Sequence, residues 1–229
     1  MRILLLGHGR MGQLVESLAP SYSATIAGVI DEASGDRAIA DGQFGSVDVA
    51  IDFTLAEAVV KNLPQLAERK INVVIGTTGW QAQEAAMRDI AAKAGIGVLA
   101  AANFSLGMNV FQLAVEEASR NFARHADFGA WIHESHHVMK KDAPSGTAVS
   151  IKRGMEAAGY DRPIDVSSTR VGTVPGTHTV GFDGPSETIE FTHTVRDRAV
   201  FARGALAAAK WLVGKQGWFS IRDLLRAES

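Results

Sequence analysis

The 229-residue sequence contains no cysteine. This absence excludes disulfide scaffolds, thiol catalysis and cysteine-ligated metal sites, and it fits a reducing compartment. An excess of charge of one sign is also missing, because 23 basic residues stand against 25 acidic ones and the formal net charge is −2. Without a global positive field, we expect neither a nucleic-acid partner nor an anionic membrane partner, and a local basic patch is the alternative left open.

Long apolar runs are absent as well. The N-terminal run over Ile3–Leu6 is far too short to cross a membrane, and no signal-peptide cleavage pattern accompanies it. The remaining composition, 46% hydrophobic and 21% charged, is that of a packed globular protein and excludes a disordered or collagen-like chain. We therefore expect a protein of one or two domains. We expect it to be located in the cytoplasm.

The first hundred residues alternate short apolar runs with segments of helical periodicity. Strands are predicted over residues 3–6, 24–30, 47–53, 71–75 and 98–101, and a first helix over residues 10–18. Pro64 lies in the helical pattern after the third strand and is expected to kink or split that helix. Strands that alternate with helices in this way predict parallel βαβ units and an α/β fold.

The pattern changes after Asn103. Helices are predicted over residues 108–122 and 145–158, strands over 127–134 and 188–195, and Thr-, Gly- and Pro-rich connections between residues 158 and 188. This half predicts a second, α+β domain built on an open mixed sheet. Helical periodicity returns over residues 199–213, but the pattern alone does not assign that helix to either domain.

A glycine-rich turn follows the first predicted strand. Gly7, Gly9 and Gly12 form the pattern G-x-G-x-x-G, and Arg10 and Met11 open the helix after it. The first glycine permits a tight turn, the second lets the backbone approach a pyrophosphate, and the third lets helix and strand pack closely. We expect a Rossmann dinucleotide site here, with an ordinary strand–turn–helix as the alternative.

An acidic pair follows the second predicted strand. Asp31 lies 19 residues past Gly12, the spacing of an acid that hydrogen-bonds the adenosine ribose of a dinucleotide. Glu32 beside it would repel a 2′-phosphate, so we expect NADH to be preferred over NADPH. Arg37 is close enough in sequence to weaken this preference.

Two further loops follow the fourth and fifth predicted strands, at the edge where open parallel sheets bind ligands. Their small and hydroxyl-bearing residues allow a cofactor to approach the backbone, although either loop alone is compatible with a plain turn. The loop residues are Gly76, Thr77, Thr78 and Gly79 in the first, and Ala101, Ala102, Asn103 and Phe104 in the second.

The segment of residues 134–148 holds adjacent histidines, two lysines and a predicted helix start. Ser145 is a good N-cap, and the free N–H groups of Gly146 and Thr147 would bind a carboxylate or phosphate. Lys140 carries positive charge toward the same anion and is able to donate a proton. A neighbouring histidine is suited to acid–base chemistry near neutral pH. The alternative is a solvated loop with structural histidines.

Two other chemistries are disfavoured in this segment. His133, His136 and His137 lack a well-spaced carboxylate that would complete a ligand set, so we expect no metal site. Ser145 lacks the glycine pattern of a nucleophile elbow and is not expected to be a nucleophile.

The segment, read as E-x-H-H-x-x-K-x-D-A-P-S-G-T-A, resembles the signature of the 4-hydroxy-tetrahydrodipicolinate (dihydrodipicolinate) reductase family of bacterial lysine biosynthesis. The resemblance includes the glycine-rich turn and extends to residues 51–54, 76–79, 101–105, 189–193 and 198–211. It therefore spans nearly the whole chain. One departure follows Asp-Phe-Thr, where Leu55 and Ala56 replace the basic residue and proline of many members.

The resemblance implies an oxidoreductase acting on a CH–CH group. It would use NADH or NADPH to reduce the cyclic imine 4-hydroxy-tetrahydrodipicolinate, a dicarboxylate, to tetrahydrodipicolinate. By the same resemblance, His136 is the proton donor or acceptor, Lys140 is the general acid, and His137, Gly146 and Thr147 contact the substrate. Gly76–Thr78 and Ala101–Phe104 would hold the nicotinamide, and Asp31 the adenosine ribose.

The resemblance also implies an architecture. Residues 1–104 and 199–229 would form the dinucleotide-binding domain, and residues 105–198 the substrate-binding and oligomerisation domain, whose open sheet forms the core of a homotetramer. Ile189, Phe191 and Val195 would contribute to the face of that sheet or pack against the domain's own helices. A regulatory NAD(H)-binding module without catalysis, and a dehydrogenase of another small carboxylic acid, are the alternative functions.

Overall fold

The computed structural model describes residues 1–35 and 37–227, which form two compact units. The first unit comprises Met1–Leu106 together with the segment from Ala199 onward, and the second comprises Gly107–Arg198. The helix that the sequence pattern assigned to neither domain therefore lies in the first unit.

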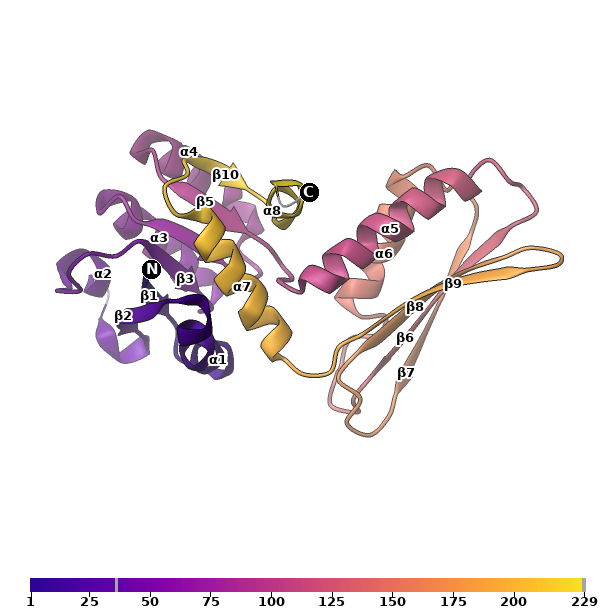
Figure 1. Cartoon of the computed structure of the whole chain (residues 1–229), viewed down its shortest axis with the longest axis horizontal. Helices are drawn as coiled ribbons and strands as arrows, with labels where there is room; N and C mark the ends of the chain where they lie inside the picture. The colour runs from indigo at the N-terminus through magenta and orange to yellow at the C-terminus, as the bar shows by residue number, and fades with distance from the viewer. Residues whose placement is uncertain (36, 228–229) are drawn as a thin grey trace. The chain divides into compact units, whose positions relative to one another are not determined.

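Six parallel strands form the sheet of the first unit (Figure 1), in the order β10-β5-β4-β3-β1-β2. The strands are β1 (Arg2–Leu6), β2 (Thr25–Ile30), β3 (Val49–Asp52), β4 (Asn72–Ile75), β5 (Gly97–Ala100) and β10 (Gly217–Phe219). This is the predicted Rossmann-like α/β arrangement. Its central strands are apolar along their length because helices cover both faces of the sheet.

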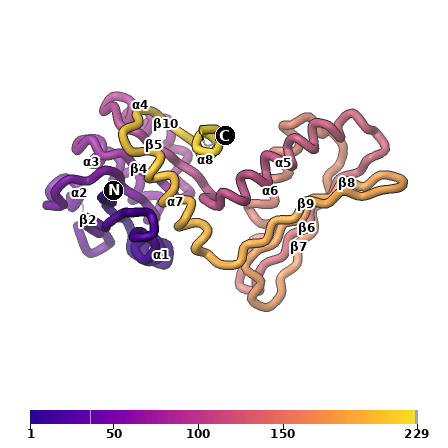
Figure 2. The backbone as a smooth tube through the Cα atoms, viewed as in Figure 1, coloured from indigo at the N-terminus to yellow at the C-terminus, as the bar shows by residue number. Residues whose placement is uncertain are grey.

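Alternate residues of the sheet pack against helices on opposite faces. Ile3 and Leu5 of β1 lie in one core cluster with α1 and α7, whereas Leu4 and Leu6 lie in another with α3 and α4. The helices of this unit are α1 (Arg10–Leu18), α2 (Ala38–Asp41), α3 (Ala56–Glu68), α4 (Glu84–Ala94), α7 (Ala199–Leu212) and α8 (Ile221–Ala227). Figure 2 traces α7 into β10 and α8, which complete the unit.

The helix α3 continues through Pro64 from Ala56 to Glu68, so the expectation that proline splits it is wrong. Proline removes one backbone hydrogen bond from the helix interior. Leu63 and Leu66, on either side of it, are both buried in the core, and this packing holds the two halves of the helix against the sheet.

The second unit is a four-stranded mixed sheet in the order β7-β6-β8-β9, with two helices on one face (Figure 1). The elements are α5 (Leu106–Phe122), β6 (Gly129–His136), α6 (Gly146–Ala157), β7 (Ile164–Arg170), β8 (Thr177–Asp183) and β9 (Thr188–Thr194). β6 pairs in parallel with β7, and β8 pairs antiparallel with both β6 and β9. The prediction of irregular connections between residues 158 and 188 is therefore wrong where β7 and β8 form.

The two faces of this sheet differ in chemistry. Val180, Phe182 and Phe191 belong to the core that α5 and α6 cover, so Phe191 packs toward this unit's own helices. The opposite face carries threonine ladders, with the Thr177 and Thr194 hydroxyls 3.1 Å apart. This face therefore presents hydroxyl groups to its surroundings.

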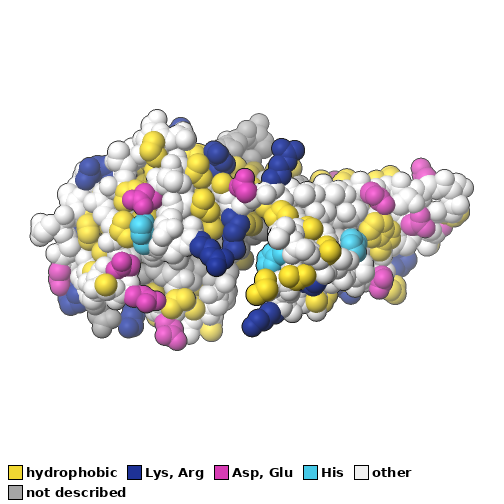
Figure 3. All heavy atoms as spheres, turned by 90° about the horizontal axis from the view of Figure 1, so that it is seen from below, with side chains coloured by type: hydrophobic (Ala, Val, Ile, Leu, Met, Phe, Trp, Pro, Cys, Tyr) yellow, Lys and Arg dark blue, Asp and Glu magenta, His cyan; other side chains and the backbone are white. Residues whose placement is uncertain are grey.

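None of the described helices is long and apolar enough to cross a membrane. Acidic and basic side chains are interspersed over the surface shown in Figure 3, in keeping with the small net charge.

Candidate active site

The turn between β1 and α1 has the tight geometry that its glycines predict. Gly7 has a φ of +85°, and a Cβ at this position would lie 2.6 Å from the carbonyl oxygen of Phe53. A Cβ at Gly12 would lie 2.1 Å from the Gly7 carbonyl oxygen. Only glycine therefore fits at these two positions.

The start of α1 is open to an anion. Gly9 is the N-cap and has no side chain to pair with the first amides of the helix, and a Cβ at Gly9 would meet no atom within 4 Å. The Arg10 side chain is exposed beside it, and Met11 packs against the core. Unpaired amides at a helix start bind phosphate well, so the turn suits a pyrophosphate.

A cavity of about 700 Å³ lies beside this turn, at the carboxyl ends of β1, β2 and β3. Asp31 and Glu32 line it together with Gly7 and Gly9. The Asp31 carboxylate accepts hydrogen bonds from the Ala33 amide and the Ser34 hydroxyl, both at 3.0 Å, which fix its orientation at the end of β2.

The charges around this cavity are mixed. Glu57 and Lys61 of α3 line it in addition to Asp31 and Glu32. Arg37, which the sequence suggested as a phosphate contact, forms an exposed ion pair with Asp41 at 3.5 Å. Acidic groups therefore outnumber basic ones around this cavity.

The two predicted nicotinamide loops border a second cavity of about 460 Å³ at the carboxyl ends of β4, β5 and β10. Thr77, Ala101 and Ala102 line it, and Thr78 is exposed next to Thr77. The adjoining residues hold the loops in place. A Cβ at Gly76 would lie 2.1 Å from the Phe53 ring. The Asn103 side chain accepts a hydrogen bond from the Ser105 amide at 2.8 Å. The Phe104 ring is buried against Phe53, so only the Phe104 backbone is available to a ligand.

A buried carboxylate joins the first of these loops to the loop after β3, and sequence reasoning did not assign it to the site. Asp52, at the end of β3, accepts hydrogen bonds from the Thr54 amide at 2.9 Å, the Asn62 amide at 3.1 Å and the Thr77 hydroxyl at 3.1 Å. Burial raises the pKa of Asp52, and these hydrogen bonds oppose the rise. The side chain therefore couples the loops after β3 and β4.

In the second unit, β6 directs Glu134 and His136 to the face covered by helices and His133 to the other face, because strand side chains alternate. His133 instead contacts the Ser167 hydroxyl at 2.9 Å. The three histidines considered as metal ligands in the sequence are therefore not brought together. His137, the first residue after β6, is half-buried.

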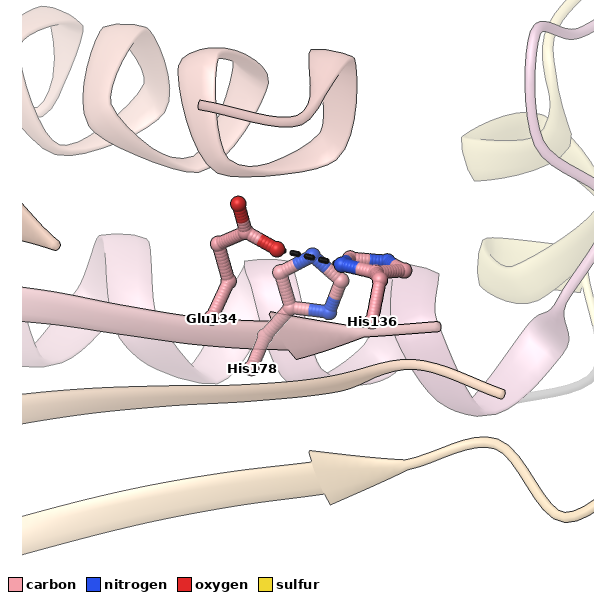
Figure 4. A group of neighbouring side chains, drawn as sticks. All are labelled: Glu134, His136 and His178. Atoms are coloured by element: carbon pink, nitrogen blue, oxygen red, sulfur yellow. Dashed lines mark hydrogen bonds and ion pairs between the residues drawn. The ribbon is translucent and has the colours of Figure 1, made fainter. Parts of the chain in front are cut away.

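Glu134 is the centre of a hydrogen-bonded cluster. Its side chain is fully buried and pairs with His136 Nδ1 (Figure 4). Arg170 of β7 donates to both carboxylate oxygens, at 3.0 and 2.8 Å, and the Ser145 amide donates to one of them at 3.3 Å. The carboxylate thus joins β6, β7 and the start of α6.

The electrostatics of this cluster shift the pKa values of both Glu134 and His136. Burial alone would raise the pKa of Glu134, but hydrogen bonds from Arg170, Ser168 and His136 lower it to about 2. Burial lowers the pKa of His136, and Glu134 opposes this effect. A neutral His136 beside an ionised Glu134 carries its hydrogen on Nδ1, so Nε2 is the atom available for proton exchange with a ligand.

The Lys140 ammonium lies on the loop between β6 and α6, where it pairs with the Asp142 carboxylate at 2.8 Å. The predicted N-cap forms, because the Ser145 hydroxyl accepts the Ala148 amide at 3.1 Å. The Gly146 amide donates to Asp142 at 3.3 Å, and Thr147 follows it, half-buried, in the first turn. Lys140 and the start of α6 therefore share one carboxylate.

His178 of β8 completes the cluster, and sequence reasoning did not identify it. It is buried, its Nε2 lies 3.1 Å from the Ser145 hydroxyl, and its ring centroid lies 5.1 Å from that of His136. Burial lowers the pKa of His178 to about 4. The ring is thus a neutral partner of the residue that caps α6.

Two models of one protein family match the chain. "Dihydrodipicolinate reductase, N-terminus" matches residues 1–104, and "Dihydrodipicolinate reductase, C-terminus" matches residues 107–225. The chain belongs to the dihydrodipicolinate reductase family. Membership confirms the predicted activity, that of an NAD(P)H-dependent oxidoreductase of the lysine and diaminopimelate pathway.

Individual reductases match along their whole length. The 4-hydroxy-tetrahydrodipicolinate reductase of Christiangramia forsetii is 36% identical over 236 residues, with 98% of each chain covered. That of Xanthomonas axonopodis pv. citri is 38% identical over 239 residues, again with 98% of each chain covered. The dipicolinate-bound dihydrodipicolinate reductase from Paenisporosarcina sp. TG-14 shares the fold, with a TM-score of 0.81, 20% identity, and coverage of 96% of this chain and 97% of that one.

In this reductase, one carboxylate and two histidines are placed as a cation site would require. One ligand atom from each of Glu134, His136 and His178 lies within 4.8 Å of the others. However, Arg170 and the Ser145 amide already occupy the Glu134 oxygens, and a guanidinium repels a cation. The cluster therefore favours proton chemistry over metal binding, and the absence of a metal stays a prediction.

Proposed function

We propose that this reductase protonates its substrate through Lys140 and His136 and holds a substrate carboxylate with His137, Gly146 and Thr147. The observation that carries the proposal is the network centred on Glu134, which joins the His136 ring to the start of α6. The helix start and the Lys140 ammonium already bind a carboxylate, that of Asp142. Their chemistry therefore suits a dicarboxylate substrate.

The 4-hydroxyl group of 4-hydroxy-tetrahydrodipicolinate leaves as water, which gives the conjugated imine dihydrodipicolinate. This imine then gains one hydride and one proton to form tetrahydrodipicolinate. A nicotinamide held by the loops after β4 and β5 would supply the hydride. Hydride transfer moves negative charge into the conjugated imine of the ring. The Lys140 ammonium stabilises this charge and donates a proton. The amides at the start of α6 hold the anionic substrate in position. The ionised Glu134 holds the His136 ring in the tautomer that leaves Nε2 free to exchange a proton with the substrate or with water.

For the cofactor, we propose NADH over NADPH. The support is the pair Asp31 and Glu32 at the end of β2, because one carboxylate accepts the ribose hydroxyls and the second repels a 2′-phosphate. The residues proposed to bind the remainder of the cofactor are those of the glycine-rich turn and of the two nicotinamide loops. They are Gly7, Gly9, Arg10, Met11, Gly12, Gly76, Thr77, Thr78, Ala101, Ala102, Asn103 and Phe104.

We also propose a homotetramer built on the hydroxyl-rich face of the β6–β9 sheet. No helix of its own unit covers this face among the described residues, and paired sheets are a common way to cover one. Light scattering during size-exclusion chromatography measures the assembly directly, and a monomer would contradict the proposal. The cytoplasmic location stays a prediction.

An assay of NADH oxidation with freshly made 4-hydroxy-tetrahydrodipicolinate tests the chemistry. We expect substrate-dependent oxidation by the wild-type enzyme and its loss in Lys140→Ala and His136→Gln, with NADH binding retained. Binding of NADH without turnover would favour the regulatory module instead. Turnover with a different small carboxylic acid only would favour another dehydrogenase.

A further inference from the structure

Arg170 makes a two-pronged contact with the buried carboxylate of the cluster. It lies at the end of β7, paired in register with His136 of β6. Its two terminal nitrogens contact the two oxygens of Glu134, at 3.0 and 2.8 Å. This bidentate geometry is specific to the planar guanidinium, and it fixes both the position and the plane of the carboxylate.

The same guanidinium also holds the loop that carries Lys140. Its Nε donates to the Lys140 carbonyl oxygen at 3.2 Å, and one terminal nitrogen donates to the Asp142 carbonyl oxygen at 2.5 Å. Arg170 is therefore bonded to the carboxylate that orients His136 and to the backbone on which Lys140 stands. Both groups proposed to handle protons depend on this one side chain.

We propose that Arg170 is a positioning residue of the reduction, which holds the Glu134–His136 pair and the Lys140 loop in one fixed arrangement. This inference rests on the proposed roles of His136 and Lys140. Arg170 acts through these two residues, because its donors are directed at Glu134 and at main-chain carbonyls. Loss of such contacts displaces reacting groups, and a shift of about 1 Å is enough to slow catalysis by roughly a hundredfold.

Arg170 also sets the charge balance around His136. The charged and titratable groups that face this ring are Glu134 on β6, Arg170 on β7, His178 on β8, and Lys140 on the loop. Glu134 raises the pKa of His136, whereas Lys140 and Arg170 lower it. Removal of Arg170 is therefore expected to raise the pKa of His136, a change that a merely structural role does not require.

Arg162 provides a matched control. It belongs to the same unit, and its guanidinium also donates to three main-chain carbonyls, those of Phe122, Ala123 and Phe128. Its side chain is 24% exposed, against 18% for Arg170. Arg162→Ala therefore measures how the loss of a carbonyl-bound arginine changes activity and thermal stability when the contacts of Glu134 are kept.

The experiment compares Arg170→Ala, Arg170→Lys and Arg162→Ala in the full-length enzyme. The measurements are kcat, the KM values for both substrates, the pH profile of kcat/KM, and the thermal midpoint. For Arg170→Ala we expect a roughly 10- to 100-fold loss of kcat, an unchanged KM for NADH, and a pH profile shifted to higher pH. Added guanidinium should restore part of the lost kcat of Arg170→Ala. It should not raise the kcat of Arg162→Ala.

Arg170→Lys keeps the positive charge and carries the test if Arg170→Ala does not fold. We expect its kcat to be as low as that of the alanine variant, because an ammonium cannot reproduce the bidentate contact of the guanidinium with Glu134. A folded Arg170→Lys with kcat within threefold of the wild type and an unshifted pH profile would overturn the proposal. Equal losses in the Arg170 and Arg162 variants, without rescue by guanidinium, would overturn it too. If the proposed roles of His136 and Lys140 are themselves wrong, the variant Lys140→Ala will show full activity, and this result is distinct from those above.

Discussion

The Lys140 ammonium and the Asp142 carboxylate form an ion pair, with 2.8 Å between Nζ and Oδ1. The Gly146 amide donates to the same carboxylate, and the hydrogen bond from Lys140 lowers the pKa of Asp142, which keeps it ionised. Lys140 is proposed to protonate the substrate, and Gly146 is proposed to bind its carboxylate. The Asp142 side chain, which is 54% exposed, therefore occupies donors that are proposed to face the substrate.

We predict that Asp142→Asn binds dicarboxylates more tightly, because the substrate no longer competes with an internal carboxylate. Exposed ion pairs contribute about 0.2–1 kcal/mol, so the Kd should fall by up to about fivefold. Calorimetric titration with dipicolinate, which the Paenisporosarcina enzyme binds, measures the change. Asp161→Asn, an equal charge change at an exposed residue beside Arg162, is the control and should leave the Kd unchanged. Weaker binding by Asp142→Asn would show that Asp142 supports the site.

Lys140→Ala should lower kcat by roughly a hundred- to ten-thousandfold, the usual contribution of a general acid. The Kd for NADH should not change, because the proposed dinucleotide site lies in the other unit. Steady-state kinetics and a direct NADH titration separate the two effects. Lys141→Ala is the matched control, since it removes the same charge from the adjacent, exposed position. Equal kcat values for the two variants would remove Lys140 from the chemistry.

The proposed preference for NADH rests on Asp31 and Glu32, which line the cavity beside the glycine-rich turn. We predict a lower KM for NADH than for NADPH in the wild type, and a reversed preference in Glu32→Arg, because arginine pairs with a 2′-phosphate that glutamate repels. Comparison of kcat/KM for the two cofactors measures the change. Glu68→Arg reverses a charge on the exposed end of α3 and should keep the wild-type preference. If Glu32→Arg leaves the ratio of kcat/KM for NADH and NADPH unchanged, the adenosine binds elsewhere.

The first unit was predicted well from sequence because its signals are local. Each strand is a short apolar run, and each helix repeats its apolar residues every three or four positions, as in α1, which begins and ends as predicted. The short β10 and the helix α8 were not predicted. Three residues in β10 are too few to establish a period, and β10 forms through pairing with β5, more than a hundred residues away in sequence.

The strands β7 and β8 were not predicted because several of their inward positions carry polar groups. Ile164 and Val166 point into the core, but Ser168 and Arg170 follow at the next inward positions of β7, so the apolar alternation stops halfway. In β8, His178 takes the inward position before Val180. Polar side chains at inward positions remove the hydrophobic pattern by which a strand is recognised.

The same reasoning explains which site residues were found. His136, Lys140 and Ser145 stand in one short segment, where their residue types are visible together. Arg170 and His178 reach the cluster only through the pairing of β6 with β7 and β8. These contacts join residues more than thirty positions apart, and no local pattern encodes them.

We predict that His178 makes the stability of the enzyme depend on pH. Burial lowers its pKa from 6.5 to about 4 in the folded state. As the pH falls from 6.5 toward 4, the unfolded chain takes up a proton at this histidine and the folded chain does not, so the free energy of unfolding decreases. The shift corresponds to about 3 kcal/mol across this window. Urea unfolding at a series of pH values between 7 and 4 measures the decrease.

The variant His178→Gln should flatten this dependence, since a glutamine gains no proton on unfolding. It should not abolish the dependence, because burial also lowers the pKa of His136 in the same sense. His133→Gln, on the opposite face of β6, is the control and should retain the full decrease between pH 6.5 and 4. An unaltered decrease in His178→Gln would mean that His178 is already protonated in the folded enzyme. Its Nε2 would then donate to the Ser145 hydroxyl as part of a cation.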